Sequence, residues 1–186
     1  MKTSRYFGAF LLLTTSVFAN AQEAEFILGL DLGRNSINID QEFAIIDTEF
    51  DSDGYSLGYV LGYRWENNLV AEANIAYASN DSFFRAFDYY ETSEIKLMLG
   101  YSFEIAEHLR IVPMLGFSRW ELETKEGRLF NPGPEEQKEF DGTDLTYKVR
   151  MDFPVGQLVV LSLSYAKSEL DASEIAITQF GIKFEF

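Results

Sequence analysis

The chain has 186 residues, a formal net charge of −15 and no cysteine. This length fits one domain, the acidic balance disfavours nucleic acid as a partner, and the missing thiols exclude a disulfide framework and thiol chemistry. Aromatic residues make up 16% of the chain, and most of them recur at alternate positions. Such alternation indicates β-strands.

The first 21 residues have the features of a secretory signal peptide. Lys2 and Arg5 give a positive start, an apolar run follows over 7–13, and Ala19-Asn20-Ala21 is a small-x-small cleavage site. The apolar run is short for a transmembrane helix, and a buried N-terminal helix is the less favoured alternative. We expect residues 1–21 to be removed and residues 22–186 to form the mature domain.

Eight segments of alternating hydrophobicity follow, and each is about as long as a tilted strand that crosses a bilayer. They cover residues 26–33, 55–66, 69–79, 94–103, 109–120, 144–153, 158–166 and 174–186. The connections after the second, fourth and sixth segments are short, and the others are long. Outer-membrane barrels have short periplasmic turns and long external loops. The pattern predicts an all-β fold, an eight-stranded antiparallel up-and-down transmembrane β-barrel with both termini in the periplasm.

The last segment carries an apolar stripe on alternate residues up to the chain end. In a soluble protein such an edge strand is an aggregation hazard, whereas in a membrane barrel it closes the sheet and faces lipid. The pattern polar-x-Gly-x-x-aromatic-x-aromatic resembles the C-terminal signal that the assembly machinery of outer-membrane proteins reads. The residues that carry it are Gln179, Gly181, Phe184 and Phe186.

Charged residues occupy the other face of the alternating segments. They are Asp31, Arg64, Glu66, Glu72, Lys96, Glu104, Arg110, Lys148, Arg150, Asp152, Lys183 and Glu185, six basic and six acidic. A soluble barrel would turn its apolar face inward instead. Because charges away from bulk water must be paired, we expect a neutral, plugged lumen. Its central ion-pair network is predicted to contain Arg64, Glu72, Lys96, Lys148 and Arg150.

Aromatic residues gather near both ends of the apolar face. Tyr63, Trp65, Tyr101, Phe103, Phe153, Phe184 and Phe186 fall near the predicted periplasmic end, and Tyr55, Tyr77, Phe117, Tyr147 and Tyr165 near the outer end. These two clusters are typical of the aromatic girdles at the membrane interfaces. A soluble β-sandwich, the main alternative fold, leaves them unexplained.

The stretch DSDGYSLGYVLGYRW over 51–65 is typical of the second strand of small outer-membrane barrels, and Glu72 fits the same pattern. With these residues the chain resembles the porin-family outer-membrane proteins that include the OmpA barrel, OmpX and the opacity-type surface proteins. The resemblance implies an integral outer-membrane protein of a Gram-negative bacterium, exported through the periplasm. It also implies contact with outer-membrane lipid and lipopolysaccharide, and with the barrel-assembly machinery during biogenesis.

The long connections 34–54 and 121–143 are rich in acidic residues. They favour a structural or surface-interaction role with an extracellular partner. Divalent-cation binding is less favoured, because the acidic run over 47–54 lacks a downstream glutamate at EF-hand spacing. We expect no metal site and no cofactor. The alternative function is a small-solute pore or a lateral transport protein, which would use the polar lumen.

Catalysis is the least favoured function. Some small barrels modify lipids with a histidine base near the outer rim, but His108 is the only histidine and lies in a predicted periplasmic turn. A Ser–His pair at the outer leaflet is therefore not expected.

Overall fold

A computed structural model describes residues 25–39, 50–79, 89–125, 137–170 and 173–186, and in these ranges the backbone forms nine strands. They are β1 (Glu25–Ile39), β2 (Phe50–Arg64), β3 (Leu69–Ser79), β4 (Tyr89–Tyr101), β5 (Phe103–Ala106), β6 (Leu109–Lys125), β7 (Gln137–Pro154), β8 (Val159–Leu170) and β9 (Ser173–Glu185). β5 continues β4 beyond Ser102, and both pair with β6. The circumference therefore consists of eight strands.

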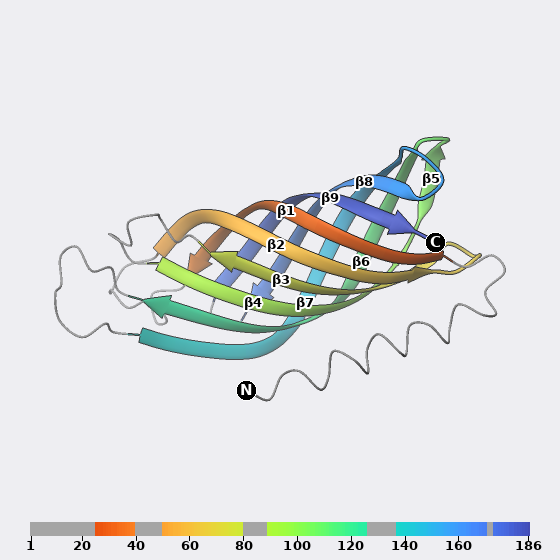
Figure 1. The fold of residues 1–186 in the computed structure, drawn as a ribbon. Helices are drawn as coiled ribbons and strands as arrows, with labels where there is room; N and C mark the ends of the chain where they lie inside the picture. Colours follow the sequence, from red (N-terminus) through yellow and green to blue (C-terminus); the bar gives the residue numbers. More distant parts are fainter. Residues whose placement is uncertain (1–24, 40–49, 80–88, 126–136, 171–172) are drawn as a thin grey trace, which may run out of the picture.

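The strands form a closed barrel (Figure 1). Every pairing is antiparallel, and β9 pairs back to β1. The register from Ile27 around the whole circuit returns to β1 at Ile37, a stagger of ten residues. Such a stagger goes with a strand tilt of roughly 35–45°. The predicted eight-stranded antiparallel barrel is confirmed. In the described ranges, no helix is long and apolar enough to span a membrane.

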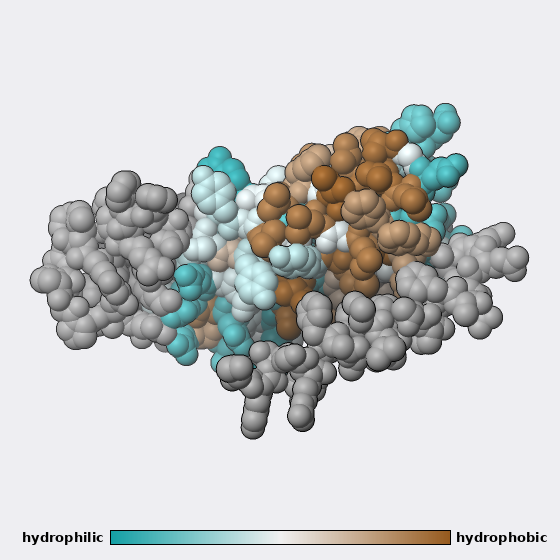
Figure 2. Space-filling view, in the orientation of Figure 1, coloured by the Kyte–Doolittle hydropathy of each residue, from teal (hydrophilic) through white to brown (hydrophobic). Residues whose placement is uncertain are grey.

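Side chains alternate between the lumen and the outer face, as strand geometry requires. On β3, every second residue from Val70 to Ala78 is buried, and Ile75 and Tyr77 between them are exposed. Exposed leucine, isoleucine, phenylalanine and tyrosine side chains from all the long strands form an apolar belt. Figure 2 shows this belt as a brown band on the face in view, with hydrophilic residues on either side of it.

The two ends of the barrel differ. The turn end carries the three short connections 65–68, 107–108 and 155–158, together with the C-terminus, and the opposite end is the loop end. Aromatic rings pack edge to face at the turn end, where the Tyr63 ring lies 4.9 Å from Phe26 and 4.8 Å from Trp65. These contacts lie where the sequence predicts the periplasmic girdle.

Only β3 has the predicted bounds, and most other strands continue further at the loop end. β1 and β2 remain paired as far as Ile39 and Phe50, and β6 and β7 as far as Lys125 and Gln137. The predicted connections 34–54 and 121–143 were therefore too long. The cause is physical, because alternating hydrophobicity stops where the lipid stops, whereas backbone pairing continues into water.

The predicted turn over 104–108 is also corrected, because β5 extends the hairpin and leaves only Glu107 and His108 as the turn. The β4–β6 register ends at Gly100 opposite Met114 and resumes at Phe103 opposite Ile111. This gap contains Pro113, which has no backbone N–H to donate to a ladder. On the other side of β4, towards β3, Ser102 N donates to Asn68 O at 2.8 Å.

Candidate functional site in the barrel lumen

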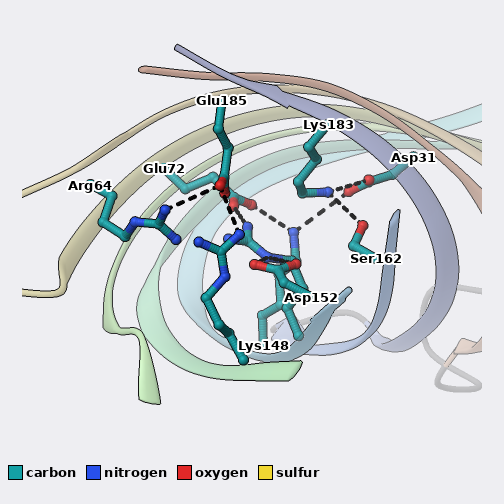
Figure 3. A network of polar contacts seen from close by, with 10 residues as sticks. Asp31, Arg64, Glu72, Lys148, Asp152, Ser162, Lys183 and Glu185 are labelled. Atoms are coloured by element: carbon teal, nitrogen blue, oxygen red, sulfur yellow. Dashed lines mark hydrogen bonds and ion pairs between the residues drawn. The ribbon is translucent and has the colours of Figure 1, made fainter. Parts of the chain in front are cut away.

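A cluster of six charged side chains fills the middle of the lumen (Figure 3). Glu72 on β3 accepts hydrogen bonds from two residues of β7 across the barrel. Lys148 Nζ lies 2.6 Å from Glu72 Oε1, and the Arg150 guanidinium contacts Glu72 Oε2. On β7 itself, Arg150 Nε lies 2.8 Å from Asp152 Oδ1.

The remaining two members come from the strands that close the barrel. Lys183 Nζ on β9 lies 2.6 Å from Asp31 Oδ1 on β1 and donates to Ser162 Oγ at 2.9 Å. Lys148 Nζ is 3.6 Å from Asp31 Oδ2, which joins the two halves of the cluster. The cluster contains three acidic and three basic side chains, each at most 3% exposed. Burying such charges is tolerated only when each has a partner.

A second cluster lies at the turn end. Glu185 Oε2 on β9 is 3.1 Å from Arg64 Nη2 on β2 and 2.7 Å from Arg110 Nη2 on β6. Arg64 also pairs with Glu25 at the start of β1. With two acidic and two basic members, this cluster is neutral too.

Towards the loop end, the lumen contains fewer charges and more aromatic side chains. Lys96 Nζ is 2.6 Å from Glu94 Oε2, which also accepts from Ser118 Oγ at 3.2 Å. Trp120 Nε1 donates to Asp144 Oδ2 at 2.5 Å, and Asn35 Nδ2 donates to the Tyr90 hydroxyl at 2.6 Å. Trp120 and Tyr90 are among the largest fully buried side chains.

The structure therefore brings together three of the five predicted network residues, Glu72, Lys148 and Arg150. Arg64 lies in the cluster at the turn end, and Lys96 pairs with Glu94 nearer the loop end. Sequence reasoning missed Glu94, although its position two residues before Lys96 on the same face was the available signal.

Two further predictions about the lumen face were wrong. Glu66 and Glu104 are exposed, because one lies in a turn and the other on the protruding hairpin of β5. The lumen also contains a buried apolar cluster beside its polar side chains, formed by Ile27, Val70, Met98, Val112 and Met114.

The residues of the predicted C-terminal signal divide between the two faces of β9. Phe184 and Phe186 are exposed on the outer face, 44% and 51% respectively. Gln179 and Gly181 face the lumen, and Gln179 Nε2 donates to Ser56 Oγ at 3.3 Å. That an assembly machinery recognises these four residues stays a prediction.

The described residues also include His108 and part of the acidic run 47–54. No group of three His, Asp or Glu side chains in these ranges could hold a metal ion. His108 is exposed in the turn between β5 and β6, at the turn end. Residues 47–49 of the acidic run lie outside the described residues, as does the predicted signal peptide, whereas residues 50–54 belong to β2.

A closed antiparallel barrel with an apolar outer belt and an ion-paired lumen has the architecture of a transmembrane β-barrel of the outer membrane. The chain belongs to the family described as outer membrane protein beta-barrel domain, whose model matches residues 7–186. The outer-membrane location that the resemblance implied is therefore confirmed.

Solved structures with the same fold include other bacterial outer-membrane barrels. Neisserial surface protein A has a TM-score of 0.67 at 14% identity, and Ail, the attachment invasion locus protein of Yersinia pestis, has 0.58 at 17%. Each match covers 89% of this chain and 100% of the other. A second Ail structure, with 19% identity, is a complex with the heparin analogue sucrose octasulfate. At these identities the likeness concerns the fold. No curated protein matches the chain.

Proposed function

We propose that this protein is a surface-interaction protein of the outer membrane, with a plugged lumen and partner contacts at its loop end. The observation that carries this function is the central ion-pair cluster. Eight strands enclose an interior that side chains can fill, and here Glu72 from one wall meets Lys148 and Arg150 from the other. This arrangement argues against the alternative of a small-solute pore through the lumen.

The outer face at the loop end supports an interaction role. By register, Glu121 on β6 lies opposite Asp141 on β7, and Glu123 lies between Glu91 and Glu139. Carboxylates gathered in this way give the outer face at the loop end a negative potential. It would suit a cationic partner, or an anionic surface such as lipopolysaccharide whose phosphates are bridged by divalent cations.

The negative charge of the loop end predicts a ligand preference that differs from that of Ail. Sucrose octasulfate, the molecule in one Ail complex, is a polyanion. A loop end rich in carboxylates would repel such a ligand. We therefore expect selectivity for positively charged partners. A lipid-modifying enzyme is the weakest alternative, since His108 lies at the opposite end from the outer leaflet in the predicted orientation.

Reversing two of the exposed charges, with Glu121→Lys and Asp141→Lys, should weaken binding to a cationic surface. Intact cells that display the protein should bind immobilised polylysine and not heparin, and the double variant should lose about tenfold in polylysine binding at low salt. The measurement is cell retention on the two surfaces, with cells lacking the protein as background.

The matched control is Glu66→Lys with Glu104→Lys, which makes the same charge change on exposed residues at the turn end. This control should leave cell retention unchanged. Equal losses in both double variants, or strong heparin binding by the unaltered protein, would contradict the proposed surface.

A further inference from the structure

The lumen face of the seam between β1 and β9 alternates in side-chain size. Gly29 lies opposite Lys183, Asp31 lies opposite Gly181, and Gly33 lies opposite Gln179. At each of these three positions a glycine on one strand faces a long or charged side chain on the other. The large side chains therefore alternate between the two strands.

These pairs are the closely spaced ones of the ladder. Phe26 and Phe186 exchange both backbone hydrogen bonds, at 3.0 and 2.9 Å. Opposed pairs in an antiparallel ladder alternate between hydrogen-bonded and non-hydrogen-bonded, and side chains are closer in the latter. Counting from Phe26, the pairs at Gly29, Asp31 and Gly33 are all non-hydrogen-bonded. Side-chain size matters most at such positions.

The glycines have no room for a side chain. A Cβ at Gly181 would overlap Asp31 Oδ1 and lie 2.5 Å from Ser162 Oγ, the two atoms that hold Lys183 Nζ. A Cβ at Gly29 would lie 2.8 Å from Lys183 Cγ, and one at Gly33 would overlap the backbone of Thr178. Gly181 thus provides the space in which the Asp31–Lys183 ion pair forms.

We propose that the lumen face of β9 is a recognition surface for β1, in which alternating side-chain size selects the observed closing register over slips of two residues. Gly181 acts in it by making room for the Asp31–Lys183 pair. This role differs from that of the outer stripe of β9, which faces lipid and carries the aromatic part of the predicted C-terminal signal.

The pattern discriminates against neighbouring registers. A slip by two residues keeps the same faces inside, so the hydrophobic pattern alone does not prevent it. A slip in one direction places Gly181 opposite Gly33, and a slip in the other places it opposite Gly29. Either slip leaves two glycines facing each other and crowds large side chains elsewhere. Of these three registers, only the observed one pairs each glycine with a large partner.

Exchanging the two residues of the Asp31–Gly181 pair tests whether side-chain size selects the register. Gly181→Asp alone should reduce the folded yield about tenfold or more, because it opposes two buried carboxylates within the space of the ion pair. Adding Asp31→Gly should restore most of the yield. In the double variant the new carboxylate lies two residues from Lys183, the spacing at which Arg150 and Asp152 pair on β7.

The variants are refolded from urea into phospholipid vesicles, where no assembly machinery is present, and the folded fraction is read from heat-modifiable gel migration. A folding defect in vesicles therefore arises from the seam between β1 and β9. If Gly181→Asp folds normally in vesicles and fails only in cells, Gly181 acts through the assembly machinery and the proposal is wrong. A double variant that folds no better than Gly181→Asp would also overturn it.

The register itself is measured with cysteines on the lipid face, since the chain has none of its own. Leu30→Cys with Ile182→Cys joins directly opposed residues, and Leu30→Cys with Phe180→Cys joins residues one slip apart. Opposed residues are closer than diagonal ones, so the first pair should form the disulfide in higher yield. In Gly181→Asp the preference for the disulfide between directly opposed cysteines should fall or reverse. If both this preference and the folded yield are unchanged, the lumen face of β9 does not select the register.

Discussion

Replacing Glu72 with alanine should lower the free energy of unfolding by about 3–5 kcal/mol, because it leaves buried basic groups without their shared partner. Lys148 and Arg150 both donate to this carboxylate, and both are at most 3% exposed. Asp31 still lies near Lys148, and Asp152 still pairs with Arg150. These contacts offset only part of the cost of burying the two positive charges. Urea unfolding of the protein in lipid vesicles measures the effect.

Two variants calibrate this result. Glu72→Gln retains the size and an acceptor oxygen but removes the charge, so it should fall between the wild type and the alanine variant. Glu121→Ala removes an exposed carboxylate on the outer face and should stay within about 0.5 kcal/mol of the wild type. If Glu72→Ala is as harmless as Glu121→Ala, the central cluster does not stabilise the barrel.

Placing arginine at Leu97 should destabilise the barrel by about 2–4 kcal/mol, the range for a basic residue on the lipid face at the bilayer midplane. Leu97 is 63% exposed and lies in the middle of the apolar belt, between Ile95 and Leu99 on β4. A soluble barrel would tolerate a charge at so exposed a position. The same vesicle unfolding experiment provides the measurement.

The control is arginine at Glu121, which is also exposed but lies beyond the apolar belt at the loop end. Its effect should be within about 0.5 kcal/mol. Equal effects at the two positions would mean that the belt does not lie in lipid. A loss only at Leu97 supports the membrane depth that the sequence pattern predicts.

The sequence was sufficient to predict the parts of the fold in which the strands face lipid. Along β3, the change from apolar to polar side chains coincides with the turn and with the loop end, so Leu69 and Ser79 were predicted as its bounds. On β6 and β7 the ladder continues past the belt through residues such as Glu123 and Glu139. Beyond the belt, both faces of the sheet are near water. The alternation of apolar and polar side chains therefore no longer indicates which residues are paired.

The lumen was predictable in composition but not in arrangement. Alternation indicated which charges face inward, whereas the choice of partner depends on the ten-residue stagger around the barrel. That stagger brings Glu72 to Lys148 and Arg150, and it places Arg64 beside Glu185 at the turn end. The apolar cluster with Met98 and Met114 was missed for a related reason, since its members come from four different strands, and only Val112 and Met114 share one.

The plugged lumen is tested most directly by single-channel recording of the folded wild-type protein in planar lipid bilayers. The six-residue central cluster predicts no sustained conductance above that of the protein-free bilayer. A steady conductance well above that background, present in every preparation of the folded protein, would contradict the plugged lumen and favour the pore.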